Sequence, residues 1–198
     1  MSRDLTIAYF GFAVASFYSP GPNNIMLLSC GLNYGFRRAS PLIAGISLGF
    51  AFLVLVVGLG LGAVFAAYPV LQTILKYAGA AYLVYLAIAI ALTRVVENDE
   101  AARPMSFFGA ALFQWVNPKG WVIVAGTTTA YAAVAPYPWN MTVLALMSLL
   151  VGLSSSAAWA LFGSAMQPIV SSPRAIRVFN IVMAALLLAS LYPVLKET

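Results

Sequence analysis

Residues 19–24 read Ser-Pro-Gly-Pro-Asn-Asn, and they lie inside an apolar stretch that runs from about residue 5 to residue 28. A proline inside a helix removes a backbone donor and clashes with the preceding turn, and the glycine between the two prolines permits unusual dihedrals. An α-helix therefore has to break at this motif. In a membrane, the freed backbone groups must be buried in protein or line a wet cavity, because lipid offers them no hydrogen bond.

A second break of the same kind interrupts the apolar stretch of residues 107–133. Residues 114–120 read Gln-Trp-Val-Asn-Pro-Lys-Gly, so a charged amine accompanies the asparagine and proline here. The two breaks lie at corresponding places in the two halves of the chain. A single proline kink often serves packing alone, but two matched breaks that carry polar amides favour a binding site.

The composition indicates the environment of these stretches. Of the 198 residues, 63% are hydrophobic and 8% are charged, whereas an ordinary soluble domain is roughly 45–50% apolar and about 25% charged. A water-soluble fold would have to expose much of this apolar surface, so the sequence predicts an all-α integral membrane protein. Helices and short loops use up the chain, which predicts a single domain over residues 1–198.

The polar residues exclude several function classes. The formal net charge is +5, but the basic residues are dispersed between apolar runs, which is typical of lipid headgroup contacts and not of nucleic-acid binding. Cys30 is the single cysteine, which excludes an internal disulfide and a dithiol redox pair. There is no histidine, and the five acidic residues lie at a terminus or in one loop. We therefore expect no metal site, no cofactor and no enzymatic activity.

The N-terminus has some features of a secretory signal, since a short apolar run at residues 5–12 precedes Ala-Val-Ala at residues 13–15. Arg3 and Asp4 cancel, however, so the region before the run has no net side-chain charge. The apolar character also continues past the apparent cleavage site. We therefore expect this segment to be retained in the first span.

Six apolar stretches are long enough to cross a bilayer, at about 20 residues for each crossing. The second and third are separated by almost nothing, which predicts a tight helical hairpin. The six predicted spans cover residues 5–28, 41–67, 70–93, 107–133, 142–166 and 176–195.

Lysine and arginine residues predict the orientation, because cytoplasmic loops carry an excess of them. On the other side of the membrane from the arginine-rich loops lie Arg3, Lys196 and at most Lys76. We therefore expect the loops after the first, third and fifth spans in the cytoplasm and both termini outside. The basic residues of these three loops are Arg37, Arg38, Arg94, Arg103, Arg174 and Arg177.

The number of spans between the two breaks predicts how the halves are related. Three spans lie between the start of one half and the start of the next, and an odd number of helices inverts the second half. The sequence thus predicts two inverted three-helix repeats, repeat A at about residues 1–95 and repeat B at about residues 105–198. Transporters built in this way bind substrate at interrupted helices, here the first and fourth.

Lys119 is the most informative candidate residue, because a charged side chain inside a span is costly and functional by default. Its ammonium could bind a substrate carboxylate or carry a transported proton; alternatively, it snorkels to the cytoplasmic interface. Tyr82 and Tyr85, about one helical turn apart, either line the cavity or pack.

Small and hydroxyl-bearing residues elsewhere are interpreted more simply. Gly45 and Gly49 have the spacing that lets two helices approach closely, and Gly58, Gly60 and Gly62 are assigned the same packing role. The three serines at residues 154–156 either form interhelical hydrogen bonds or line part of the pathway.

Five motifs, in order along nearly the whole chain, carry a family resemblance. They are residues 19–24, Gly-Phe-Arg at 35–37, Ala-Gly-Ile-Ser-Leu-Gly at 44–49, Gly-Ala-Ala-Tyr-Leu at 79–83 and Asn-Pro-Lys at 117–119. In these motifs the chain resembles the LysE/RhtB family of bacterial amino-acid exporters. It is most similar to the cysteine/O-acetylserine exporters, and next to the homoserine/threonine exporters.

The resemblance implies a multi-pass protein of the bacterial inner membrane that expels amino acids by antiport, using the proton motive force; with the orientation given by the lysines and arginines, both termini are then periplasmic. The lysine-exporting branch has an acidic residue in the second helix, where this chain holds only Ala44, Gly45, Ser47 and Gly49. We therefore expect a neutral amino acid or a derivative such as homoserine or acetylserine. Without that carboxylate, proton coupling would need Lys119, backbone groups and water.

The residues predicted to bind substrate come from the two breaks and from the third span. They are Pro20, Gly21, Pro22, Asn23, Asn24, Gln114, Asn117, Pro118, Lys119, Tyr82 and Tyr85.

Other functions remain open at this point. A passive channel or facilitator, and an importer of small amino acids on the same fold, are the alternatives to export. A membrane redox relay would need two cysteines and is excluded. The small-residue faces would permit a homodimer, although they would equally serve internal packing.

Overall fold

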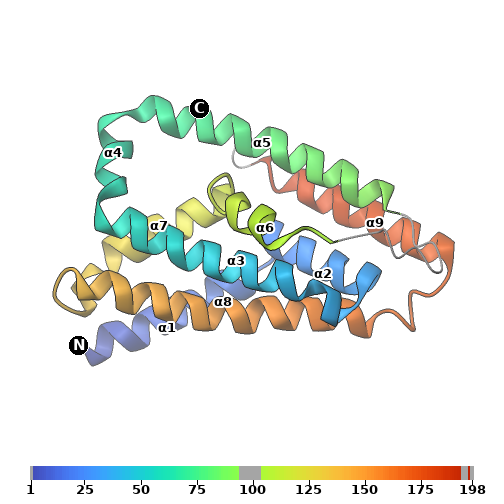
Figure 1. Ribbon diagram of the computed structural model, residues 1–198, viewed down its shortest axis with the longest axis horizontal. Coiled ribbons are helices and arrows are strands. Elements are labelled where there is room, and N and C mark those ends of the chain that lie inside the picture. Colours follow the sequence, from blue (N-terminus) through green and yellow to red (C-terminus); the bar gives the residue numbers. More distant parts are fainter. Residues whose placement is uncertain (1, 94–103, 193–195, 197–198) are drawn as a thin grey trace.

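The computed structural model describes residues 2–93, 104–192 and 196, and this part of the chain forms helices and turns without a strand (Figure 1). Two of the arginines used for orientation, Arg94 and Arg103, lie outside the described residues. The α-helices are α1 (Arg3–Tyr18), α2 (Pro22–Tyr34), α3 (Phe36–Val56), α4 (Gly62–Ala67), α5 (Pro69–Leu92), α6 (Phe107–Phe113), α7 (Pro118–Ala130), α8 (Trp139–Ala165) and α9 (Pro173–Ala189). A π-helical turn, η1 (Val57–Leu61), joins α3 to α4, and a 3₁₀ turn, η2 (Ala132–Val134), follows α7.

Within the described part of the chain, three helices are long and apolar enough to cross a membrane: Phe36–Ala67, Pro69–Leu92 and Trp139–Ala165. They coincide with the second, third and fifth predicted spans. The first and fourth predicted spans are each divided into shorter helices. The sixth corresponds to α9, which is 17 residues long. The fold is therefore that of an all-helical membrane protein. The arrangement with six crossings stays a prediction.

Both proline motifs separate one helix from the next. Helix α1 ends at Tyr18 and α2 begins at Pro22, while α6 ends at Phe113 and α7 begins at Pro118. Proline is well suited to a first helical position, because the backbone N–H that it lacks would have no partner there. Figure 1 shows the two interrupted helices running in opposite directions and approaching each other at their breaks.

Glycines allow the closest helix crossings. A Cβ on Gly45 or Gly49 of α3 would clash with the backbone of α6, at Phe107 and Ala111 respectively, which confirms the predicted packing role of this pair. Gly31 of α2 and Gly163 of α8 approach each other's helices in the same way. Helix α8 thus packs against α2 and α3, whereas α5 packs mainly against α9.

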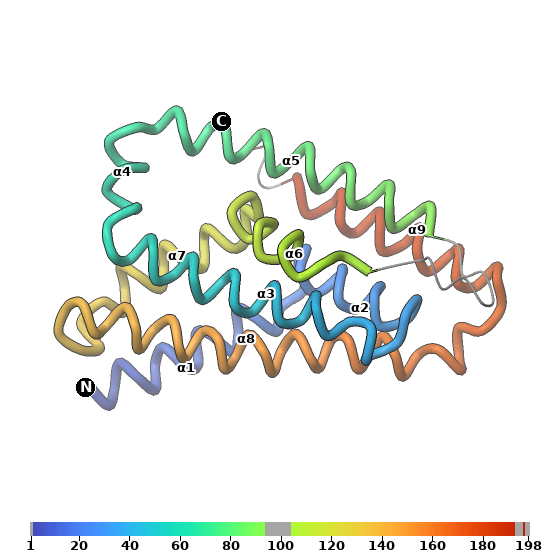
Figure 2. The backbone as a smooth tube through the Cα atoms, in the orientation of Figure 1, coloured from blue at the N-terminus to red at the C-terminus, as the bar shows by residue number. Residues whose placement is uncertain are grey.

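The connection between α3 and α5 differs from the predicted hairpin. Gly60 has a φ of 141°, a backbone conformation that side-chain-bearing residues rarely adopt, and the helix kinks there. Helix α4 then leads away from α3, so α3 and α5 do not form a tight hairpin (Figure 2). A Cβ on Gly60 would meet no atom within 4 Å. The packing role predicted for this glycine is therefore wrong, and its function is to allow the kink.

Candidate functional site

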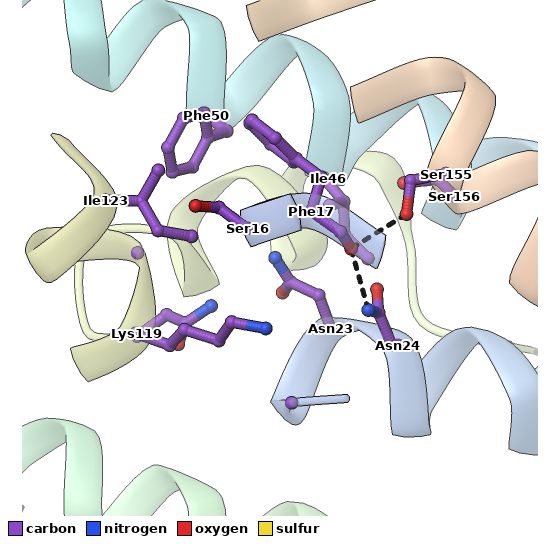
Figure 3. A pocket seen from close by; sticks show the side chains of 13 residues that line it. Ser16, Phe17, Asn23, Asn24, Ile46, Phe50, Lys119, Ile123, Ser155 and Ser156 are labelled. Carbon is purple, nitrogen blue, oxygen red and sulfur yellow. Dashed lines mark hydrogen bonds between the residues drawn. The ribbon is translucent and has the colours of Figure 1, made fainter. Parts of the chain in front are cut away.

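A small cavity lies where the breaks of the two interrupted helices meet (Figure 3). Its volume is about 30 Å³. The lining brings together five of the predicted site residues, namely Gly21, Asn23, Asn24, Asn117 and Lys119. The remaining lining residues are Ser16, Phe17, Ile46, Phe50, Gly120, Ile123, Ser155 and Ser156.

Lys119, in the first turn of α7, reaches across the cavity to the break after α1. Its Nζ donates to the carbonyl oxygen of Ser19 at 2.6 Å, to Ser19 Oγ at 2.9 Å and to the carbonyl oxygen of Pro20 at 3.2 Å. These carbonyls lie just past the end of α1, where a cation is favoured by the helix dipole. The ammonium therefore stabilises the break and stays inside the protein, which favours a site role over snorkelling.

Gly21 makes this arrangement possible. A Cβ built at this position would lie 2.6 Å from Cδ and 3.0 Å from Nζ of Lys119. The backbone of Gly21 is extended, with φ 178°, so any residue could adopt its conformation. The glycine is thus required for the space that it leaves to the lysine side chain.

Side-chain amides satisfy most of the polar groups at the first break. Asn24 Nδ2 donates to the carbonyl oxygens of Phe17 and Ser19, both at 2.8 Å. Asn23 and Gln114 exchange two hydrogen bonds between their amides. Gln114 is fully buried and lies outside the lining, so it positions Asn23 and does not face the cavity itself.

Asn117, which directly precedes α7, has the one unsatisfied amide of the site. The residue is 2% exposed, and its Oδ1 has no hydrogen-bond partner among the described residues. Buried polar atoms without a partner are rare, because losing water without compensation costs roughly 1–3 kcal/mol. An acceptor held in this state beside an ammonium can receive an N–H group of a ligand.

Serines of α8 line the side of the cavity opposite Lys119. Ser155 Oγ donates to the carbonyl oxygen of Phe17 at 2.8 Å, and Ser156 lies 3.4 Å from Ser47 Oγ of α3. Ser154 is exposed and contacts Tyr18. Both interpretations of this triplet therefore apply: all three serines form interhelical hydrogen bonds, and Ser155 and Ser156 also line the cavity.

The other predicted residues contribute differently. Pro20 provides a carbonyl to Lys119, and Pro22 and Pro118 begin α2 and α7. Tyr82 stacks near Phe113, with ring centroids 5.7 Å apart, and Tyr85 is 63% exposed. Neither tyrosine is among the residues that line the cavity.

Several lining residues were missed because nothing in the sequence distinguishes them. Ile46, Phe50 and Ile123 resemble any other apolar residue of a membrane helix, and only the fold brings them to the cavity. They give it an apolar side beside its polar breaks. The polar groups suit two opposite charges: an anion near Lys119 and the starts of α2 and α7, and a cation near Asn117 and the end of α1.

Comparison with known proteins addresses the resemblance directly. A family model described as LysE type translocator matches residues 14–190. The chain is 34% identical over 193 residues to a cysteine/O-acetylserine efflux protein of Escherichia coli O139:H28, covering 95% of this chain and 96% of that protein. Proteins of the same description from Escherichia coli K12 and Shigella flexneri are each 34% identical over 192 residues, covering 94% of this chain and 95% of theirs. No solved structure matches the chain significantly. The resemblance carried by the five motifs is thereby confirmed, and the chain belongs to the LysE type translocator family.

Proposed function

We propose that this protein exports small neutral amino acids or their derivatives from the cytoplasm across the bacterial inner membrane. The observation that carries the proposal is the ammonium of Lys119 inside a cavity formed by two interrupted helices. The descriptions of the relatives, as efflux proteins for cysteine and O-acetylserine, support this substrate class. Homoserine and threonine are the second class to test.

The cavity supports binding of an amino-acid zwitterion. The substrate carboxylate exchanges with Ser19 and Pro20 as the partner of Lys119 and approaches the backbone N–H groups that begin α2 and α7. The substrate ammonium donates to Asn117 Oδ1, the unpartnered acceptor. At about 30 Å³, the cavity is well below the roughly 300–1,000 Å³ range for ligand pockets, so the two breaks have to move apart to admit a substrate, which favours a small side chain.

The lining also supports neutral substrates over basic ones. Lys119 is the one lining residue with a charged side chain. A lysine or arginine substrate would therefore bring its second positive charge next to Lys119 with no carboxylate to balance it, which is strongly unfavourable in a low-dielectric site.

The topology that we propose has six crossings in two inverted repeats, with both termini in the periplasm. The opposite directions of the two interrupted helices support it. Helices that correspond under this scheme also pack on each other, α3 against α8 and α5 against α9. Helix α9 has 17 residues, which is the lower end of the range of about 17–25 residues for a membrane crossing. Fusion of alkaline phosphatase to the C-terminus tests the orientation, because this enzyme is active only outside the cytoplasm.

Transport against a gradient needs a source of energy, and we propose proton antiport. Lys119 is the candidate group for carrying the proton. A protonated amine would bind the substrate carboxylate and the freed carbonyls of the break much more strongly than a neutral amine would. A facilitator, which only equilibrates substrate, and an importer remain the alternatives.

The decisive experiment uses proteoliposomes with the protein in inside-out orientation. Labelled cysteine, O-acetylserine, homoserine and threonine are offered with and without an imposed pH gradient, and lysine serves as the negative substrate. Accumulation that depends on the gradient supports a proton-coupled exporter. Equilibration without accumulation supports the facilitator, and no movement of any of the four contradicts the proposed substrate class.

A further inference from the structure

Three hydroxyl side chains lie buried together at some distance from the cavity: Tyr9 of α1, Thr127 of α7 and Ser148 of α8. Their exposed fractions are 0%, 0% and 1%. Tyr9 Oη lies 2.5 Å from Ser148 Oγ, and Ser148 Oγ donates to the carbonyl oxygen of Leu144 at 2.7 Å. We call these three side chains the hydroxyl cluster. The surrounding core of the same helices is otherwise apolar, with Val124 and Leu144 among its buried members.

Thr127 is the unusual member of the hydroxyl cluster. Its side chain is close enough to the Tyr9 phenol to interact with it, but its Oγ1 has no partner with good hydrogen-bond geometry among the described residues. The two threonines that follow on α7 both donate to carbonyl oxygens of their own helix, Thr128 to Val124 at 2.9 Å and Thr129 to Ala125 at 2.7 Å. A valine has nearly the shape of threonine and would avoid an unsatisfied buried hydroxyl. In this structure, therefore, no well-formed hydrogen bond accounts for a threonine at position 127.

The hydroxyl cluster is in register with the cavity on all three helices. Each of its members lies seven positions from a residue that lines the cavity, namely Ser16, Gly120 and Ser155. Seven residues are close to two helical turns, so the same face of each helix carries both sets, roughly 10 Å apart. Ile123, between Gly120 and Thr127 on α7, lines the cavity and packs in the apolar core around the cluster.

The register also gives a direction. The hydroxyl cluster lies toward the end of the molecule where α1 begins, α7 ends and α8 begins (Figure 1). There the backbone N–H of Ser2 donates to the carbonyl oxygen of Val134 at 2.9 Å, and Asn140 Nδ2 donates to that of Ala132 at 2.6 Å. In this structure the turn η2 is thus tied to the starts of α1 and α8 beyond the cluster.

We infer that the transport path continues from the cavity between α1, α7 and α8. The hydroxyl cluster is then a second polar binding point on this path, after the cavity. Thr127 Oγ1 is the group that hydrogen-bonds the polar head of a zwitterion in transit, after the substrate has left Lys119. In this structure Tyr9 and Ser148 are hydrogen-bonded to each other. As the substrate passes, they exchange this hydrogen bond for hydrogen bonds to the substrate. The inference rests on the proposed function, because it assigns the exit route of the same cavity.

The first test compares Thr127→Val with Thr129→Val, the same change at an exposed position of the same helix. Export of labelled O-acetylserine or cysteine from proteoliposomes, substrate binding to the purified protein, and the Tm are measured for both. We expect Thr127→Val to lower the maximal rate about tenfold, the effect of losing one hydrogen bond in the rate-determining passage. Its Kd stays within about twofold of wild type and its Tm does not fall, while Thr129→Val behaves as wild type.

Three results would overturn the inference. If Thr127→Val exports substrate at the wild-type rate, the hydroxyl is not part of the path. If the rate falls only together with the Tm, the hydroxyl has a structural role. An increase in Kd equal to the loss of rate would assign Thr127 to the cavity site. If the wild-type protein itself moves none of the four substrates, the proposed function fails, which is distinct from any of these results.

A second measurement does not depend on transport. In a Cys30→Ser background, Thr127→Cys is exposed to a charged, water-soluble methanethiosulfonate reagent, with Val54→Cys as the control. Val54 of α3 is equally buried in the same apolar core but belongs to none of the three helices proposed to form the path. We expect Thr127→Cys to react and Val54→Cys to remain unmodified, because the reagent needs water to reach a thiolate. Equal inertness of both would exclude a wet path at Thr127.

Discussion

The side-chain amides of Asn23 and Gln114 face each other between the two interrupted helices and exchange two hydrogen bonds, of 2.9 and 3.2 Å. Gln114 Nε2 also donates to the carbonyl oxygen of Ala110 at 3.0 Å. The pair therefore fixes the start of α2 to the end of α6 and orients Asn23 toward the cavity. Because Gln114 is fully buried, its amide cannot replace Asn23 with bulk water.

We expect Gln114→Leu to lower the free energy of unfolding by about 1–3 kcal/mol, since it removes both hydrogen bonds to the half-buried Asn23 amide and the one to the Ala110 carbonyl oxygen. Gln72→Leu is the matched control, because Gln72 is exposed on α5 and such surface changes are usually within about 0.5 kcal/mol. Unfolding midpoints in detergent measure both. An equal effect of the two substitutions would show that the Asn23–Gln114 pair contributes nothing specific.

Lys119→Met should weaken substrate binding more than it lowers stability. The substitution removes the ammonium that the substrate carboxylate needs, and hydrogen bonds to charged groups contribute roughly 1.5–3 kcal/mol each, which corresponds to a loss of affinity of about tenfold or more. Lys76→Met makes the same change on α5, away from the cavity, and should leave transport unchanged. Substrate binding to the two purified variants distinguishes them, and an unaltered Kd for Lys119→Met would contradict the role proposed for Lys119.

The breaks in the helices could be located from sequence because proline and glycine act on their own backbone, whatever surrounds them. This is why residues 19–24 and 114–120 were sufficient to find the interruptions and most of the polar cavity lining. A lysine beside the second break was informative for the same reason: its cost in a membrane span does not depend on the details of packing.

The remaining lining could not be found in this way, because it depends on which helix faces which. Phe50 and Ile123 face the cavity, while Phe52 and Val122, nearby on the same helices, are exposed. The kink at Gly60 was missed for a related reason. A glycine that lets two helices approach and a glycine that lets one helix bend have the same sequence signature, and only the surroundings distinguish Gly60 from Gly45.

The crossing of α2 and α8 gives a prediction about stability. A Cβ on Gly163 would clash with the backbone of α2 at Leu28, and no flexible side chain is there to move aside. We expect Gly163→Ala to destabilise the protein by about 1–3 kcal/mol, the usual cost of overpacking. Gly152→Ala, on the same helix, would meet its nearest atom, in the Phe17 side chain, at 3.4 Å. This control should be nearly neutral when both variants are measured by thermal unfolding. If Gly163→Ala is as stable as Gly152→Ala, the close crossing of α2 and α8 is contradicted.

Gly21→Ala should separate binding from folding at the break itself. The added methyl group would have to displace Lys119, whose Cδ and Nζ would lie 2.6 and 3.0 Å away, but the extended backbone at φ 178° tolerates alanine without strain. The flexible lysine side chain can move, so we expect the Tm to change little while substrate affinity falls about tenfold, through the lost contact of Lys119. Gly11→Ala is the matched control on α1, where a Cβ would meet nothing within 4 Å. Because alanine is favoured over glycine inside a helix by up to about 1 kcal/mol, Gly11→Ala should keep its affinity and gain slight stability. If Gly21→Ala binds substrate as tightly as Gly11→Ala, the position of Lys119 across the break is not what the substrate recognises.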